Sequence, residues 1–244
     1  PVSKAGLCIV FLAAKGAVAA YFVRPRRAPA KGEAPGAAKT PEGGGPAVIV
    51  IHENRGLNAH IEDVARRFAL AGFTTLAPDL LSPLGGTPKD EDKARELIGQ
   101  LEPAGVVGDL KAAVAWLAGH PEAGGKVGAV GFCWGGGMVN QLALAEPKLR
   151  AGVVFYGMSP DASADVRKIR SPLLLHYAEL DDRINASVPA CEAALKKAER
   201  PYTIHRYEGA QHAFHNDTNA ARYNAEAARL AWERTVEFLR KHLA

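Results

Sequence analysis

A cysteine stands in the middle of a glycine-flanked stretch, Gly131-Phe132-Cys133-Trp134-Gly135, which follows an apolar strand pattern and precedes a helical one. This spacing is typical of a nucleophile elbow, where small residues permit a tight turn between a strand and a helix. The positive end of the helix dipole favours a thiolate at that position. The stretch therefore predicts that Cys133 is a nucleophile. The alternative is a structural cysteine packed in a glycine-rich turn.

Two loops further along the chain carry an acid and a base. Asp181 and Asp182 follow an apolar run over residues 173–177, and His212 follows another over residues 202–207. The order nucleophile, acid, histidine resembles that of α/β hydrolases. In such a set the thiol attacks a carbonyl carbon, His212 moves the protons, and one of the two aspartates orients the imidazole. Four other histidines are alternatives for the base: His52, His176, His205 and His215.

The loop at residues 52–56, HENRG, follows the first of the central apolar runs. In an elbow-type site this loop supplies one backbone N–H of the oxyanion hole, and the residue after the nucleophile supplies the other. We therefore expect the amides of Asn54 and Trp134 to face the reacting oxygen. Glu53 brings a carboxylate near the thiol, unless it is a surface glutamate. Two residues at strand ends are expected to line the substrate pocket: Arg55 and Tyr156.

These residues need a scaffold that brings strand ends together, and the pattern of the chain predicts one. From residue 47 onward, apolar runs of strand length alternate with helical spacings of apolar residues. The strand predictions cover residues 47–52, 73–77, 127–131, 152–156, 173–177 and 202–207. The helix predictions cover residues 61–68, 94–101, 107–117, 138–143, 190–198 and 220–242. Such alternation predicts an α/β fold, with a mostly parallel central sheet, helices on both faces, and reactive groups beyond the carboxyl ends of the strands.

The N-terminal part of the chain is predicted to form a hairpin and a surface loop. Two apolar runs, residues 7–13 and 17–23, flank Lys15 and favour an antiparallel hairpin. The alternative is a retained export signal, whereas the short runs and the lysine disfavour a transmembrane helix. Residues 25–46 are rich in Pro, Gly and charge, which favours a surface loop. We expect residues 1–244 to form a single domain.

Composition narrows the class of protein. The 244 residues are 48% hydrophobic and carry a formal net charge of +4, which excludes a disordered chain. Three cysteines are too few, and odd in number, for a disulfide framework. The charges are scattered, so nucleic-acid binding is not indicated. We expect a small-molecule substrate, no cofactor or metal, no membrane partner, and a monomer or weak homo-oligomer. The expected location is the cytoplasm, with an exported or periplasmic protein as the alternative.

Several motifs together resemble the dienelactone hydrolases, which are carboxymethylenebutenolidase-like proteins. They are Glu53, the GFCWGG elbow at Cys133, Asp181, the HAF at His212, and the stretch HENRGLNAHIEDVARRFALAGF followed by LAPDLL. The likeness runs from about residue 17 to the C-terminus. It implies an α/β-hydrolase fold and a triad of Cys133, His212 and Asp181 that forms a thioester. It also implies that Glu53 holds the thiol neutral until a substrate anion arrives, and that this carboxylate then takes the thiol proton.

The chain departs from this family where the substrate carboxylate is bound. Members that act on dienelactone use two arginines there, one of them shortly after the histidine. Here Asn216 and Asp217 occupy that stretch, and the loop after the second central strand offers Lys89 but no arginine. Arg55 and Arg183 are candidates to replace the missing arginine. The prediction is therefore hydrolysis of a small ester or lactone, with the acceptance of dienelactone itself left open.

Two other functions are compatible with the same residues. One is a broad carboxylesterase with no preference for lactones. The other is a non-catalytic α/β-hydrolase-like protein in which the Cys133 thiol responds to oxidants and is never acylated. Activity of variants that lack the thiol or the imidazole would distinguish a hydrolase from the thiol-responsive protein, and a panel of substrates would identify the broad carboxylesterase.

Overall fold

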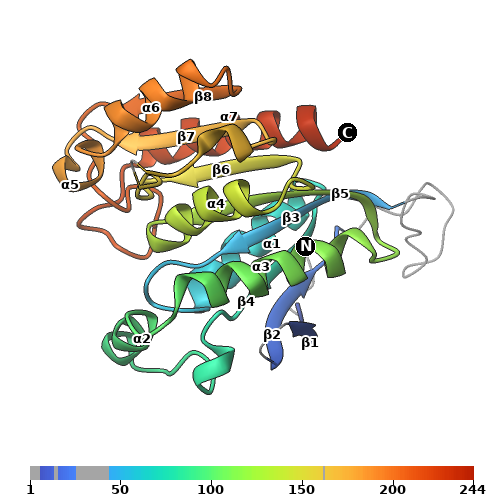
Figure 1. The fold of residues 1–244 in the computed structure, drawn as a ribbon. Coiled ribbons are helices and arrows are strands. Elements are labelled where there is room, and N and C mark those ends of the chain that lie inside the picture. The colour runs from blue at the N-terminus through green and yellow to red at the C-terminus, as the bar shows by residue number, and fades with distance from the viewer. Residues whose placement is uncertain (1–5, 14–15, 26–43, 162) are drawn as a thin grey trace, which may run out of the picture.

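An eight-stranded sheet runs through the structure, a computed structural model that describes residues 6–13, 16–25, 44–161 and 163–244 (Figure 1). The strands lie in the order β1-β2-β4-β3-β5-β6-β7-β8. Their bounds are β1 (Leu7–Ala13), β2 (Gly16–Val23), β3 (Gly45–Ile51), β4 (Thr74–Pro78), β5 (Ala123–Phe132), β6 (Ala151–Phe155), β7 (Leu173–Ala178) and β8 (Tyr202–Tyr207). The helices are α1 (Ala59–Leu70), α2 (Glu91–Ile98), α3 (Pro103–Ala118), α4 (Trp134–Ala145), α5 (Asp182–Asn185), α6 (Val188–Lys197) and α7 (Ala225–Leu243). Two short 3-10 helices are η1 (Ser82–Leu84) and η2 (Val166–Lys168).

Strands β4, β3, β5, β6, β7 and β8 are neighbours in this order, and each pair of neighbours among them is parallel. Helices cover both faces: α1 and α7 pack on one face, and α3, α4 and α6 pack on the other (Figure 1). The continuous apolar runs of β3, β6 and β7 follow from this arrangement, because their side chains are buried on both sides. The predicted α/β fold with a mostly parallel sheet is confirmed.

The predicted N-terminal hairpin is also present. Strands β1 and β2 pair antiparallel, and β2 in turn pairs antiparallel with β4. Phe11 and Phe22 of the hairpin lie against the ring of Trp116 in α3, so the hairpin shares the core of the sheet. The turn at residues 14–15 and most of the predicted loop over residues 25–46, namely residues 26–43, lie outside the described residues.

Some element boundaries differ from the sequence prediction. The first central strand begins at Gly45, so the last two residues of the predicted loop belong to β3. The final helix begins at Ala225 and not at residue 220, because the Asn224 side chain accepts the N–H of Ala227 and starts the helix there. The short helix α5 was not predicted at all. Within the described part of the chain, no helix is long and apolar enough to span a membrane.

Candidate active site

One residue joins β5 to α4. The strand ends at Phe132 and the helix begins at Trp134, so Cys133 alone makes the turn, with a φ of 52° that non-glycine residues rarely adopt. The glycines permit this turn, since a Cβ on Gly135 would lie 2.4 Å from the carbonyl oxygen of His52. The predicted elbow is therefore present, with Cys133 at the carboxyl end of β5.

A chain of hydrogen bonds joins the thiol to a buried carboxylate. His212 Nδ1 lies 2.5 Å from Asp181 Oδ2, and His212 Nε2 lies 3.0 Å from Cys133 Sγ. Because a carboxylate only accepts, Nδ1 carries the imidazole proton and Nε2 can accept the proton of the thiol. Asp181 follows β7 and also accepts the N–H of Ile184, whereas Asp182 is exposed. Of the two aspartates, only Asp181 belongs to this chain of bonds.

The other candidate histidines lie elsewhere. His52 and His176 are fully buried and hydrogen-bonded to groups of the core. His215 packs among aromatic rings, and His205 lies on the edge strand β8. Burial lowers the pKa of all four. Among the described histidines, the hydrogen bond to the thiol comes from His212 alone.

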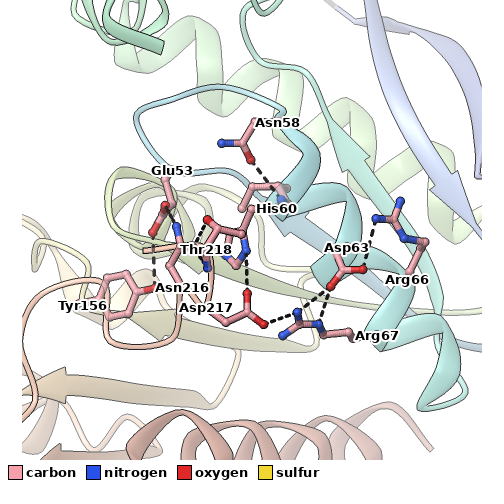
Figure 2. Close-up of polar contacts among 11 residues, drawn as sticks. Glu53, Asn58, His60, Asp63, Arg66, Arg67, Tyr156, Asn216, Asp217 and Thr218 are labelled. Carbon is pink, nitrogen blue, oxygen red and sulfur yellow. Dashed lines mark hydrogen bonds and ion pairs between the residues drawn. The ribbon is translucent and has the colours of Figure 1, made fainter. Parts of the chain in front are cut away.

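Glu53 is buried, with its carboxylate held between Tyr156 and Asn216 (Figure 2). Its Oε1 accepts from the Tyr156 hydroxyl at 3.5 Å, and its Oε2 accepts from Asn216 Nδ2 at 3.1 Å. Both donors are neutral. Burial raises the pKa of Glu53, and the two hydrogen bonds oppose that shift. Glu53 is therefore not a surface glutamate but a buried acid with an increased tendency to hold a proton.

The resting thiol is neutral, which differs from the thiolate that the helix dipole alone predicts. Burial, followed by the negative charge of Glu53, raises the pKa of Cys133 to about 11. The N–H of Trp134 and the charge of Arg183 act in the opposite direction and are outweighed. Burial also lowers the pKa of His212, so the imidazole is neutral too. The Cys133 thiol and the His212 imidazole are therefore both uncharged while the cavity is empty.

Of the two backbone N–H groups expected in the oxyanion hole, one contacts the thiol and the other belongs to a residue of the same cavity wall. The Trp134 N–H interacts with the Cys133 sulfur and lowers the pKa of the thiol. Asn54 lies in the cavity wall with Cys133, and its N–H has no acceptor within the described residues. An N–H without a protein acceptor can donate to the oxygen of a ligand. This arrangement is compatible with an oxyanion hole.

Cys133 opens into a cavity that has two parts. The first, the polar lobe, has a volume of about 600 Å³. Its wall includes Glu53, Arg95, Arg183, His212, Asn216 and Arg222. Arg55 also lies in this wall, but its guanidinium donates to Asp92 and to the Glu91 carbonyl oxygen. In the described part of the chain, neither Arg183 nor Arg222 forms an ion pair.

The second part, the apolar lobe, has a volume of about 430 Å³. Its wall includes Ile98, Trp134, Gly137, Met138, Met158 and Ile184. The two lobes share Cys133, Asn54, Arg95 and Arg183, so they meet at the thiol. Tyr156, expected in the pocket wall, is fully buried behind Glu53 and is not among the described residues that line either lobe. Neither is Lys89.

Sequence reasoning missed three residues of this site. The sequence marks Asn216 only as a position where the family has an arginine. Nothing in the sequence, apart from its place shortly after His212, predicts its contact with Glu53. Arg95 resembled an ordinary residue of the polar face of a helix. Arg222 lay in a segment predicted as helix, whereas it is part of the loop before α7.

Comparisons with known proteins place the chain among hydrolases. A family model described as "Dienelactone hydrolase family" matches residues 35–243. A protein of Saccharolobus solfataricus named "Putative carboxymethylenebutenolidase" is 33% identical over 239 residues, which cover 83% of this chain and 91% of that protein. A protein of Bradyrhizobium sp. named "Probable 2-oxo-3-(5-oxofuran-2-ylidene)propanoate lactonase" is 33% identical over 211 residues, which cover 81% of this chain and 84% of that protein.

A solved structure has the same fold throughout. The crystal structure of "Putative Dienelactone Hydrolase" from Klebsiella pneumoniae matches with a TM-score of 0.79 and 28% sequence identity. The match covers 98% of this chain and 100% of the other. The similarity therefore extends over the N-terminal hairpin as well as the sheet that carries the site.

Proposed function

Because the chain belongs to the dienelactone hydrolase family, we propose that Cys133, His212 and Asp181 are its catalytic triad. The family predicted from the motifs is confirmed, and it makes the protein a lactone or ester hydrolase. The observation that supports the triad most directly is the hydrogen-bond chain from the sulfur through both imidazole nitrogens to Asp181 Oδ2. The expected substrate is a small ester or lactone.

In the first half of the reaction the thiol proton must leave before the sulfur can attack. The resemblance implies Glu53 as its acceptor, but the acceptor in hydrogen-bond contact with the thiol is His212 Nε2. We therefore assign the proton to His212. Glu53 controls the timing, because its negative charge keeps the thiol protonated while the cavity is empty. A substrate that neutralises or screens this carboxylate lowers the pKa of Cys133 and releases the nucleophile.

The sulfur then forms a bond to the carbonyl carbon, and the amides of Trp134 and Asn54 donate to the oxyanion. Each such donor contributes roughly 3–4 kcal/mol to transition-state stabilisation in hydrolases of this kind. The carbon–oxygen bond to the alcohol breaks, and His212 gives its proton to the departing oxygen. Water next attacks the thioester and gives a proton to His212. The carbon–sulfur bond breaks, and the sulfur takes the proton back, which leaves the free acid.

An anionic substrate has two cationic partners in the polar lobe. Arg183 and Arg222 line this lobe, and neither has an ion pair among the described residues. Arg55, the other candidate to replace the missing family arginine, is already bound to Asp92. We therefore assign the carboxylate of a charged substrate to Arg183, with Arg222 on the same wall. Asn216 does not take this role, because its amide donates to Glu53.

The test is hydrolysis of p-nitrophenyl acetate and of a small lactone. Cys133→Ala and His212→Ala should each lower kcat/KM by about a thousandfold or more, since triad members act as one unit. Cys191→Ala is the matched control, because this half-buried cysteine lies outside both lobes, and it should retain full activity. Activity that survives both triad substitutions would refute the triad. A protein that hydrolyses neither substrate, but whose Cys133 thiol is oxidised by a mild oxidant, would instead indicate a thiol sensor.

A further inference from the structure

The cavity is divided at the reacting sulfur, and the two lobes differ in chemistry. Cys133 belongs to both, but His212 lines the polar lobe only, and Trp134 lines the apolar lobe only. We propose that the apolar lobe binds the acyl side of the substrate and that the polar lobe holds the alcohol side. This inference rests on the proposed triad and adds the substrate class to it: esters or lactones of an apolar carboxylic acid.

The position of the proton donor assigns the alcohol side. When the tetrahedral intermediate collapses, the carbon–oxygen bond breaks and the alcohol oxygen must receive the proton that His212 Nε2 took from the thiol. A general acid acts only within hydrogen-bond reach of the oxygen it protonates. The departing oxygen therefore lies next to His212, on the side of the polar lobe. The same lobe then admits the water that attacks the thioester, because this water must give its proton to the same nitrogen.

The acyl group takes the remaining direction. It stays bonded to Cys133 Sγ after the alcohol has left, and its carbonyl oxygen must face the amides of Trp134 and Asn54. Trp134 lines the apolar lobe only, and Asn54 lines both lobes. Because the departing oxygen points to the polar lobe and the carbonyl oxygen points to these amides, the substituent on the acyl carbon is left with the direction of the apolar lobe. For a lactone, the alcohol oxygen and the acyl carbon belong to one ring, which then spans both lobes and opens at the sulfur.

The wall of the apolar lobe sets the chemistry of the acyl group. Ile98, Trp134, Met138, Met158 and Ile184 contribute apolar surface there. The Met158 side chain is 41% exposed, and its unbranched thioether can adapt to the shape of a bound chain. Its backbone is fixed, because the Met158 carbonyl oxygen accepts from Asn140 Nδ2. Such a wall favours an alkyl or aryl substituent over a polar one.

Two ester series separate the lobes. In p-nitrophenyl acetate, butanoate and hexanoate the acyl chain grows, and in ethyl, butyl and hexyl acetate the alcohol chain grows. We expect kcat/KM to rise by about fourfold for each added acyl methylene until the lobe is full, because each methylene leaves water for apolar surface. Lengthening the alcohol should leave kcat/KM within about twofold, since the polar lobe offers little apolar surface.

Two substitutions alter the apolar lobe in opposite directions. A Cβ on Gly137 would meet no atom outside the neighbouring α4 backbone closer than 3.7 Å, so the position has room for a side chain, and Gly137→Val is chosen to fill part of the lobe. It should lower kcat/KM for hexanoate about tenfold more than it lowers kcat/KM for acetate. Met158→Ala enlarges the lobe and should move the preferred acyl chain to a longer one. Ala220→Val is the control, because exposed Ala220 lines the polar lobe only and should not alter the acyl preference.

The outcomes are distinct from those that test the triad. A preference for long alcohols with no gain from long acyl chains would overturn the assignment of the lobes, and so would equal losses for acetate and hexanoate in Gly137→Val. Either result would leave the triad intact as long as wild type hydrolyses acetate and Cys133→Ala does not. If wild type fails on acetate and on the small lactone, the proposed function fails first.

Discussion

At the level of single residues, burial and the charge of Glu53 together keep the Cys133 thiol protonated. Burial and this charge together raise the pKa of Cys133 to about 11, so alkylation of the resting protein by iodoacetamide should be slow at neutral pH and increase toward that value. Glu53→Gln removes the negative charge beside the thiolate and should lower the pH midpoint of alkylation. Mass spectrometry of the peptide that contains Cys133 measures the rate separately from Cys8 and Cys191.

A matched variant tests whether the effect depends on where the carboxylate lies relative to the Cys133 sulfur. Glu91→Gln removes a carboxylate from the same cavity wall, but Glu91 is not among the main causes of the pKa shift at the thiol. Its alkylation midpoint should equal that of wild type. An unchanged midpoint in Glu53→Gln would mean that the carboxylate does not interact with the sulfur.

The sequence predicts those site residues whose proposed role requires a particular position at the end of a strand. The nucleophile must follow a strand and precede a helix, so Cys133 and its glycines are visible as a motif. Asp181 and His212 follow strands for the same reason. Asn216 and Arg222 could not be found in this way, because the direction of a loop side chain depends on what the loop packs against. Only the folded chain brings Asn216 against Glu53, 163 residues earlier.

Between elements, a network of charged side chains connects the loop that carries His212 to α1. Figure 2 shows Asp217 between His60 and Arg67 of this helix. Asp217 Oδ2 accepts from Arg67 at 2.5 Å, and its Oδ1 lies 3.5 Å from His60 Nδ1. Arg67 also donates to Asp63 one turn earlier in the helix. Asn216 directly precedes Asp217 in the chain. The network therefore helps to hold the Asn216 amide that donates to Glu53.

Breaking this network should affect catalysis more than stability. Asp217→Asn removes the ion pair with Arg67 at a partly exposed position, which should cost about 1 kcal/mol of unfolding free energy. We expect kcat/KM for p-nitrophenyl acetate to fall by about tenfold, because a small displacement of the loop misplaces His212. Arg66→Gln is the control: it removes ion pairs with Asp63 and Glu62 on the same helix but none with the loop. Equal kinetics in both variants would mean that the network does not position the site.

The elements themselves could largely be predicted, because apolar runs and helical spacings report burial directly. Which strands pair with each other is harder to predict from the sequence. The pattern indicated a hairpin, but nothing local to β2 specifies that its inner neighbour in the sheet is β4, which lies beyond β3 and α1 in the chain. Helix α5 has four residues, too few for an apolar period to appear.

At the scale of the whole molecule, the contacts of the hairpin support the proposal that residues 1–244 form one domain. β2 is hydrogen-bonded to β4, and Phe22 packs edge-on to Trp116 of α3. Separating the hairpin would break the sheet and expose these rings. An isolated two-stranded hairpin is only marginally stable, so we propose that it folds with the rest of the chain.

Buried histidines should make the fold sensitive to acid. Burial, followed by the charges of His60 and Arg67, lowers the pKa of His215 to about 3, whereas the unfolded chain titrates near 6.5. Between these values the unfolded state binds a proton that the folded state does not. Stability is therefore retained above about pH 6.5 and falls by about 1.4 kcal/mol per pH unit below it for this residue.

His215→Phe tests this expectation, because a phenyl ring can pack against Phe132, Phe155 and Trp232 and cannot be protonated. The unfolding free energy, measured by urea denaturation, should fall less steeply from pH 6.5 to pH 5 in the variant than in wild type. His52 and His176 continue to titrate, so some slope remains. Identical slopes would show that His215 is protonated in the folded protein.

Strand β1 forms one edge of the sheet, and its outer row of backbone groups is unpaired within the described chain. Leu7, Val10 and Leu12 are more than half exposed there, and no charge interrupts the strand. Proteins usually protect such an edge with a lysine, a proline or a bulge. We therefore expect this edge strand of seven residues, at the side of the sheet remote from Cys133, to limit the solubility of the protein at high concentration, and Val10→Lys to raise it.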